Sequence, residues 1–295
     1  QELGYRPNPL ARGLRGASTM LLGVIVRDIT DPFFAGAIEA VTVEASRRGY
    51  NVVLGHAHAR ADEAIALWAV LEARHCDAIL LFGDMRDQPR LIEDLAGTRV
   101  PVVALWQGSR PTDVASVSVD NRAGIRAVLQ HLAALGHRRI AYVGARALGD
   151  IKEREEAYVE FMARLDGSVK DRYIRHRPNE FAGGMTGFDE LFDLPQPPTA
   201  LVTSTDVLAI GALHAASERG LVVPHEVSIA GFDDIPVAEF TVPALTTVRM
   251  PVRQMVAKAM QMVLDDSQLD PSRPAVLQPS LVVRATTDRV SGPPG

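Results

Sequence analysis

Short apolar runs alternate with helix-like segments along almost the whole chain, and this alternation constrains the fold more than any other feature. The run Leu21 to Val26 is continuously apolar, as expected for a strand covered on both faces. The next segment, Phe33 to Arg48, has apolar residues at helical spacing, and Gly49 after it is suited to ending a helix. A repeated strand-helix-strand order favours parallel sheets with right-handed crossovers.

The alternation predicts two consecutive sets of elements. In the first set we expect further strands at 52–54, 78–82 and 101–106, and helices at 62–74 and 89–96. In the second set we expect strands at 117–119, 140–143, 173–174, 198–203 and 227–231, with helices at 121–135, 152–165, 185–192 and 206–219. The fold class is therefore α/β, with two doubly wound parallel-sheet subdomains.

The last part of the chain predicts that the chain crosses back between the subdomains. A helix at 252–264 and a strand at 276–283 are too little for a third domain. We expect the helix to pack on the first subdomain and the strand to return to the second. Several such crossovers would form a hinge, and a ligand would bind at the carboxyl ends of the two sheets.

Length and composition agree with two domains of a water-soluble protein. The chain has 295 residues, of which 47% are hydrophobic and 23% charged, and its apolar runs are too short to cross a membrane. No secretory signal opens the sequence. The single cysteine, Cys76, excludes an internal disulfide framework and indicates the cytoplasm, and we expect its side chain to be buried.

The charge is distributed unevenly between the N-terminal end and the rest of the chain. The formal net charge of −5 argues against nucleic-acid binding by the whole body. Residues 1–16, however, contain Arg6, Arg12 and Arg15 against Glu2, a net +2 that leaves −7 for the remainder. Any DNA contact is therefore expected through the N-terminal end.

Motifs typical of enzymes are absent from the sequence. It has no glycine-rich phosphate loop after a strand and no G-x-S-x-G nucleophile motif. His56 and His58 form an H-x-H pair without further ligands at zinc-like spacing. Asp233 and Asp234 are adjacent carboxylates without a marked nucleophile, and at most one is expected to face a ligand. We therefore expect no catalytic activity, no metal and no cofactor.

Several motifs in a fixed order carry a resemblance to a known family. They are L-G-Y-R-P-N at 3–8, A-R-G-L-R at 11–15, D-I-T-D-P-F-F at 28–34, L-G-H-R-R-I at 135–140, T-D-x-x-A-I-G-A at 205–212, G-F-D-D at 231–234 and P-A-L-T-T-V at 243–248. Together they resemble the lac repressor family of bacterial transcription factors over nearly the whole chain. The resemblance implies a periplasmic-binding-protein-like core of type I that binds a small effector.

The resemblance also implies a division of the chain. Residues 1–19 would be a residual hinge segment, 20–119 plus 250–275 the N-terminal subdomain, and 120–249 plus 276–290 the C-terminal subdomain. A family member carries a helix-turn-helix headpiece directly before the position of Gln1, so a partial chain is expected. In the hinge, Leu14 would wedge into the minor groove of operator DNA, and Arg12 and Arg15 would contact phosphates. The family further implies a homodimer without membrane contact.

The effector site implied by the resemblance consists of seven positions. These are Phe33, Trp106, Asp150, Arg154, Phe181, Thr205 and Asp233. Arg154 would grip ligand atoms, Asp233 would accept hydrogen bonds from the ligand, and Phe33 and Trp106 would line the cleft, while Phe34 would pack in the core. Phe181 would act as an aromatic lid. Asp206 follows Thr205 at a helix start, where an N-cap role is expected.

The chain departs from the family pattern at two of these places. Leu148 stands where a purine-binding member has an arginine, which weakens a purine assignment. Thr205 stands where sugar-binding members often have asparagine, which weakens a simple hexose. The remaining polar and aromatic set favours a sugar or sugar derivative.

The alternative function is a periplasmic sugar-binding protein of a transport system. Such a protein would have the same body and a secretory signal, and would not need Leu14 with its flanking arginines. The regulator is favoured because these hinge residues are present.

Overall fold

The chain folds into two compact α/β units. The computed structural model describes residues 18–58, 60–83, 100–105, 114–145, 149–166, 171–265 and 269–290. One unit comprises Gln1–Ser118 and Val252–Ala275, and the other Val119–Pro251 and Val276–Gly295. The chain therefore passes between the units three times, at 118–119, 251–252 and 275–276. Each unit contains a parallel sheet with helices, which confirms the predicted fold class.

The first unit is built on a six-stranded sheet of order β11-β5-β4-β3-β1-β2. Its strands are β1 (Leu21–Val26), β2 (Asn51–His56), β3 (Ala78–Phe82), β4 (Val102–Leu105), β5 (Ser116–Val119) and β11 (Ala275–Leu277). Its helices in the described ranges are α2 (Pro32–Arg47), α3 (Ala61–Ala73) and α9 (Val252–Leu264). Pairing is parallel from β2 through β1, β3 and β4 to β5.

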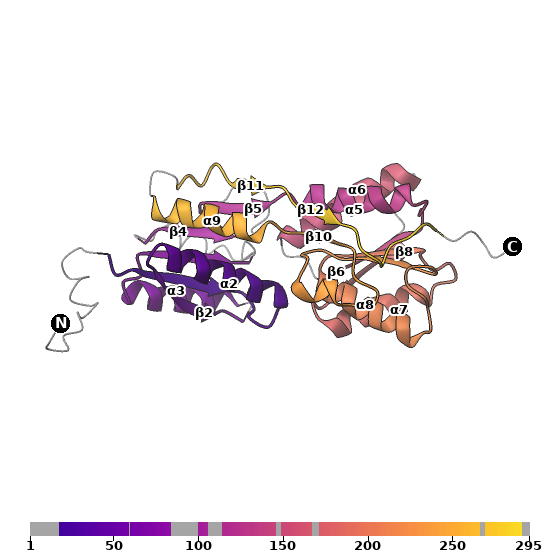
Figure 1. Ribbon diagram of the computed structural model, residues 1–295, viewed down its shortest axis with the longest axis horizontal. Coiled ribbons are helices and arrows are strands. Elements are labelled where there is room, and N and C mark those ends of the chain that lie inside the picture. Colours follow the sequence, from indigo (N-terminus) through magenta and orange to yellow (C-terminus); the bar gives the residue numbers. More distant parts are fainter. Residues whose placement is uncertain are drawn as a thin grey trace. The chain divides into compact units, whose positions relative to one another are not determined.

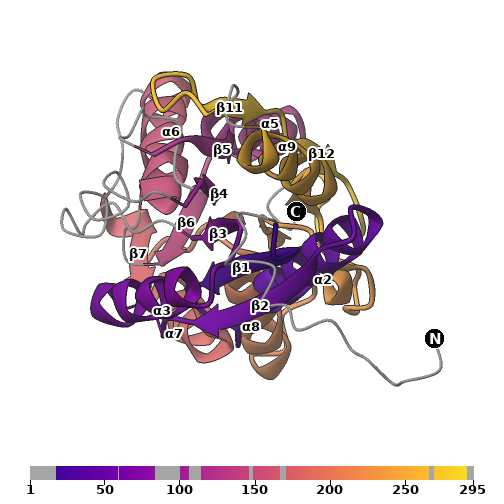
Figure 2. The same ribbon diagram turned by 90° about the vertical axis from the view of Figure 1, so that its left-hand side faces the viewer.

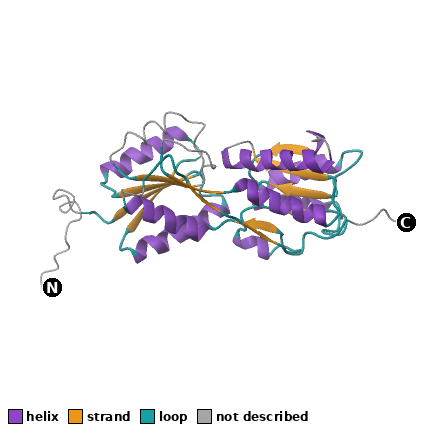
Figure 3. Cartoon of the chain, turned by 90° about the horizontal axis from the view of Figure 1, so that it is seen from above, coloured by secondary structure: helices purple, strands orange, loops and turns teal. Residues whose placement is uncertain are grey.

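The helices cover both faces of this sheet, as Figure 3 shows for the first unit. On one face, Leu71 of α3 packs in a buried cluster with Ile25, Ile79 and Leu81. The α2 helix packs against α9, although more than two hundred residues separate them in the sequence (Figure 2). The late helix thus belongs to the first unit, although it follows most of the second unit in the sequence.

The second unit contains a four-stranded parallel sheet of order β7-β6-β8-β9. Its strands are β6 (Ile140–Ala145), β7 (Ile174–Arg177), β8 (Ala200–Thr203) and β9 (Ser228–Ala230), and β10 (Thr247–Arg249) pairs antiparallel with β12 (Ser280–Val282) in a separate two-stranded sheet. Its α-helices are α5 (Asn121–Ala134), α6 (Gly149–Asp166), α7 (Phe181–Phe192) and α8 (Asp206–Glu218). Figure 1 shows α5 and α6 together on one side of the sheet, with α7 and α8 together on the other.

The contact between α7 and α8 is unusually close because both helices carry glycine there. A Cβ atom on Gly211 would lie 2.0 Å from the carbonyl oxygen of Phe181, and one on Gly184 would lie 2.1 Å from that of Leu208. Real Cβ atoms essentially never approach another atom this closely. The two helix backbones therefore touch, and the first turn of α7 lies directly against α8.

Most predicted elements are present, but the prediction of one continuous last strand was wrong. The expected strand at 276–283 is two short strands, and β11 joins the first sheet while β12 pairs with β10. The break falls at Gln278 and Pro279, where proline lacks the N–H needed to continue a ladder. The helix expected from 185 starts at Phe181. The helix expected at 89–96 lies outside the described residues.

The carboxylate of Asp77 anchors the segment that enters β1. It accepts hydrogen bonds from the backbone N–H groups of Thr19 and Met20, both at 2.9 Å, and from the hydroxyls of Ser18 and Thr19. These bonds hold the pKa of Asp77 below its ordinary value, although partial burial works in the opposite direction. The neighbouring Cys76 is buried, and burial raises the pKa of its thiol.

Within the described ranges, no helix is both long and apolar enough to cross a bilayer.

Candidate functional site

The carboxyl ends of the parallel strands in the second unit bring the predicted polar residues together. Ser204 follows β8, and its hydroxyl accepts a hydrogen bond of 3.0 Å from the N–H of Ala145 at the end of β6. Phe232 and Asp233 follow β9 in the same way. Parallel strands end at one edge of a sheet, so residues far apart in sequence become neighbours here.

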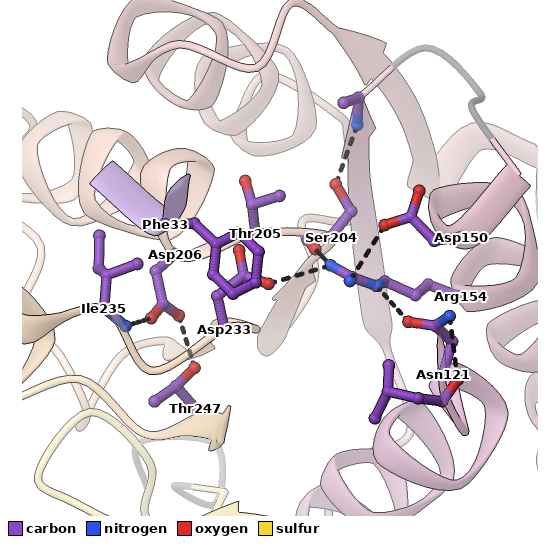
Figure 4. Close-up of polar contacts among 12 residues, drawn as sticks. Phe33, Asn121, Asp150, Arg154, Ser204, Thr205, Asp206, Asp233, Ile235 and Thr247 are labelled. Carbon is purple, nitrogen blue, oxygen red and sulfur yellow. Dashed lines mark hydrogen bonds and ion pairs between the residues drawn. The ribbon is translucent and has the colours of Figure 1, made fainter. Parts of the chain in front are cut away.

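Arg154 lies at the centre of this edge, with 3% of its side chain exposed (Figure 4). Its Nη1 atom donates to the Ser204 carbonyl at 2.5 Å and lies 3.4 Å from Oδ1 of Asp233. Its Nη2 atom lies 3.3 Å from Oδ2 of Asp150. The guanidinium carbon also lies 3.8 Å from the centroid of the Phe232 ring. A buried arginine is thus compensated by two carboxylates, a carbonyl and an aromatic face.

Asn121 binds the Nε–H donor of this arginine. Its Oδ1 atom accepts from Nε of Arg154 at 2.9 Å, and its Nδ2 atom donates to Glu153 at 3.1 Å. Glu153 and Arg154 are both buried although they are consecutive charged residues. Such groups persist in a protein interior only when they are paired and hydrogen-bonded.

Asp233 is held in a strained backbone conformation. Its φ angle is +118° and that of Asp234 is +58°, a region that side-chain-bearing residues seldom adopt. Strain of this kind clusters at ligand-binding sites. The two carboxylates point to different partners: Asp233 pairs with Arg154, and Asp234 pairs with Arg249 and Arg284. Only the first of the two adjacent aspartates therefore belongs to the Arg154 cluster.

Thr205 and Asn179 form a second polar pair beside the cluster. The Thr205 hydroxyl donates to Oδ1 of Asn179 at 2.6 Å and accepts from the N–H of Leu208 at 3.4 Å. Phe181, the first residue of α7, is 48% exposed. Thr205 is therefore the N-cap of α8 as well as a candidate site residue.

The expected N-cap role of Asp206 was wrong. Asp206 is the first residue of α8 and is fully buried, with Oδ1 accepting from the Thr247 hydroxyl at 2.5 Å and Oδ2 from the N–H of Ile235 at 2.9 Å. Burial raises the pKa of Asp206 to about 7 despite these hydrogen bonds. Its carboxylate joins the start of α8 to the loop after β9 and to β10.

Phe33 lies in the first unit, at the start of α2. Its N–H donates to Oδ1 of the N-cap residue Asp31 at 3.0 Å, and its partly exposed ring packs edge-to-face on Phe34 at 5.5 Å between centroids. Phe34 is the buried member of this pair, as predicted. Trp106 and the three hinge residues Arg12, Leu14 and Arg15 lie outside the described residues.

The histidine pair lies at the end of β2 without a metal-like arrangement. The rings of His56 and His58 are 3.9 Å apart between centroids, and His58 contacts Glu63 at 2.5 Å. Among the residues that the structure describes, no group of three or more His, Cys, Asp or Glu side chains could hold a metal ion.

Four residues of the cluster and of the polar pair beside it had not been predicted as site residues. They are Asn121, Asn179, Ser204 and Phe232. Each of them lies within two residues of the start of a helix or after the end of a strand at the same sheet edge. Their position after predicted strands was a usable signal, since ligand sites in open α/β sheets form there. Their partners, however, are 26 to 78 residues away in the sequence.

Comparison with known proteins identifies relatives of nearly the whole chain. A family model described as a periplasmic binding protein-like domain matches residues 129–287. The "HTH-type transcriptional repressor CytR" of Escherichia coli (strain K12) is 33% identical over 270 residues, which is 91% of this chain and 79% of that protein. These similarities extend across both units.

Solved structures share the same fold. A LacI transcriptional regulator from Rhodococcus species is 31% identical, with a TM-score of 0.81 over 92% of this chain and 99% of that chain. A transcriptional regulator CelR–cellobiose complex is 26% identical, with a TM-score of 0.79 over 97% of this chain and 87% of that chain.

Proposed function

The chain belongs to the LacI family of transcriptional regulators, and we propose that it is a DNA-binding repressor whose core binds a sugar or sugar derivative as effector. One observation carries the proposal: a transcriptional repressor is 33% identical over 91% of this chain. The similarity to a regulator in complex with cellobiose supports a sugar as the ligand class. The relatives named here are regulators and not enzymes.

The Arg154 cluster supplies the chemistry that a polyhydroxy ligand requires. The guanidinium donates hydrogen bonds, and the carboxylates of Asp150 and Asp233 accept them, so hydroxyl groups of a sugar can be bound as donors and acceptors at once. The Arg154–Asp233 contact of 3.4 Å is long for a charge-assisted pair. A ligand hydroxyl that bonds both groups would therefore replace a weak contact with two stronger ones. Phe33, Trp106, Phe181 and Thr205 complete the proposed site.

The proposed DNA contacts lie at the N-terminal end. Arg12 and Arg15 would neutralise phosphates, Leu14 would wedge into the minor groove, and a headpiece would read the operator. A homodimer in the cytoplasm would place two such ends on two half-sites. The second unit exposes a candidate contact for the second copy, because Phe240 is 74% and Val242 is 97% exposed.

The effector acts through its different affinity for two arrangements of the regulator. A ligand that binds both equally would shift nothing, whatever its affinity. The proposed role of the two units is to bind the effector together, so that its binding changes the spacing of the DNA-binding ends.

The proposal is tested by ligand-induced thermal stabilisation and by operator binding. Cellobiose, ribose and glucose are screened first, followed by sugar acids and polyols; a ligand present at 100 times its Kd stabilises by about 2.7 kcal/mol. Asp233→Asn and Arg154→Met should abolish the shift, whereas the exposed control Gln130→Ala should retain it. A full shift in both site variants would contradict the site. A full-length protein without any operator binding would favour the periplasmic sugar-binding protein instead.

A further inference from the structure

Asn121 lies where the chain has just entered the second unit. It is the first residue of α5, and 1% of it is exposed. The unit boundary falls between Ser118 and Val119, two residues earlier. Because β5 ends at Val119, the side chain of Asn121 lies between the end of this crossover and the polar cluster around Arg154.

Both ends of the Asn121 amide have partners that determine its orientation. Oδ1 accepts from Nε of Arg154 at 2.9 Å, while Nδ2 donates to Oε2 of Glu153 at 3.1 Å and to the Val119 carbonyl at 3.4 Å. Arginine offers donors only, and an ionised carboxylate or a carbonyl offers acceptors only. A flipped amide would place its oxygen against two acceptors and its N–H groups against a donor, so only one orientation satisfies all partners.

The same turn joins two of the three crossovers. The backbone N–H of Asp120 donates to the carbonyl of Leu277 at 2.9 Å, and the chain crosses between the units at Ala275 and Val276, just before Leu277. The Asp120 carboxylate caps α5 by accepting from the N–H of Ala123 at 2.8 Å. Asn121, Asp120 and Leu277 therefore form a short path from the guanidinium of Arg154 to both crossovers.

We infer that Asn121 is a positioning residue that holds the Arg154 guanidinium and ties it to the crossovers at Val119 and Leu277. The inference rests on the proposed role of Arg154 as an effector contact. Without Asn121, the Nε–H of Arg154 would be buried with no acceptor, and the guanidinium could turn about its remaining contacts. An effector that changes how Arg154 is held would, through this amide, change how firmly the crossover turn is held.

Two measurements on the protein without effector test this inference. The first is the ¹⁵N spectrum of the arginine Nε–H groups, with the Arg154 signal assigned by Arg154→Lys. The second is hydrogen exchange of the Asp120 amide, which bonds Leu277. In Asn121→Ala we expect exchange at both positions to rise at least tenfold, while amides in the core of β8 stay protected. The exposed amide side chain of Gln130 on the same helix gives the control Gln130→Ala, which should leave both rates unchanged.

A charge-conserving exchange separates positioning from general packing. Asn121→Asp places a carboxylate against Glu153 and should speed exchange of the Asp120 amide at least tenfold. Adding Glu153→Gln gives this contact one amide and one carboxylate again, with the amide now at position 153 and the carboxylate at position 121. The double variant should therefore recover most of the protection of the Asp120 amide against exchange. If Asn121→Ala does not fold, the comparison of Asn121→Asp with the double variant still tests whether Asn121 positions Arg154. Unchanged Arg154 Nε–H exchange in Asn121→Ala, or no recovery in the double variant, would overturn the inference.

These measurements distinguish a failure of the positioning role from a failure of the effector proposal. If no sugar binds but both exchange rates respond, the effector proposal fails and the positioning role stands. If cellobiose or another sugar binds and the rates do not respond, the positioning role fails and the effector proposal stands.

Discussion

Replacing Gly211 with alanine should destabilise the second unit, whereas the same substitution at Gly36 should slightly stabilise the first. Both glycines lie inside helices, where alanine is favoured over glycine by roughly 0.5–1 kcal/mol. At Gly36 a new Cβ atom meets nothing within 4 Å, so only this gain remains. At Gly211 the new atom would lie 2.0 Å from the Phe181 carbonyl oxygen and 3.1 Å from the Cα atom of Gly184.

The clash at Gly211 cannot be relieved by a side-chain rotation, because both neighbours are backbone atoms. Helices α7 and α8 would have to separate by about 1 Å, and overpacking of this kind costs typically 1–3 kcal/mol or more. After subtraction of the propensity gain, we expect Gly211→Ala to destabilise by about 2 kcal/mol, which lowers Tm by roughly 4–8 °C. Gly36→Ala should raise Tm slightly. Differential scanning calorimetry of both variants measures these shifts, and a Gly211→Ala variant as stable as the wild type would refute the backbone contact.

Three further predictions concern Asp206, Asp77 and Leu14. The pKa of Asp206 is raised to about 7, so the folded state binds a proton more tightly than the unfolded state, and ionisation of this group lowers the free energy of unfolding as pH rises from about 4 through 7. Urea unfolding at a series of pH values should show this decrease in the wild type and not in Asp206→Asn. The same pH dependence of the free energy of unfolding in both proteins would contradict the prediction. The pKa of Asp77 is lowered, so its contribution to stability is present above about pH 4 and is lost as pH falls through the folded-state pKa. Asp77→Asn should therefore cost about 1–2 kcal/mol at pH 7 and progressively less as pH falls, which the same unfolding assay at a series of pH values measures. In a chain with its headpiece, Leu14→Ala should weaken operator binding several-fold in a gel-shift assay while the effector Kd stays constant, and equal operator affinity would count against the wedge.

Local patterns predicted most elements of this fold from the sequence. The continuous apolar runs at β1 and β3 and the helical spacing in α2 and α9 depend on residues a few positions apart, so they are readable without the tertiary structure. The family resemblance likewise predicted a site with Arg154, Asp150 and Asp233, and the fold brings each of the two carboxylates to within 3.4 Å of the Arg154 guanidinium in an ion pair. The assignment of the two units to the halves of an effector site, and the roles of the site residues, stay predictions.

The tertiary structure alone decided which groups contact one another. Arg154 and Asp233 are separated by 79 residues, and Asn121 and Arg154 by 33, so no local pattern predicts these contacts. Helix propensity could not tell whether Thr205 or Asp206 caps α8, because both residues are good caps; burial of Asp206 against Thr247 and Ile235 decided it. The expected strand at 276–283 likewise could not be divided correctly from the sequence, because its two halves, β11 and β12, pair with strands of different sheets. Sequence periodicity determines the elements, whereas the partners of each polar group are determined by the folded chain as a whole.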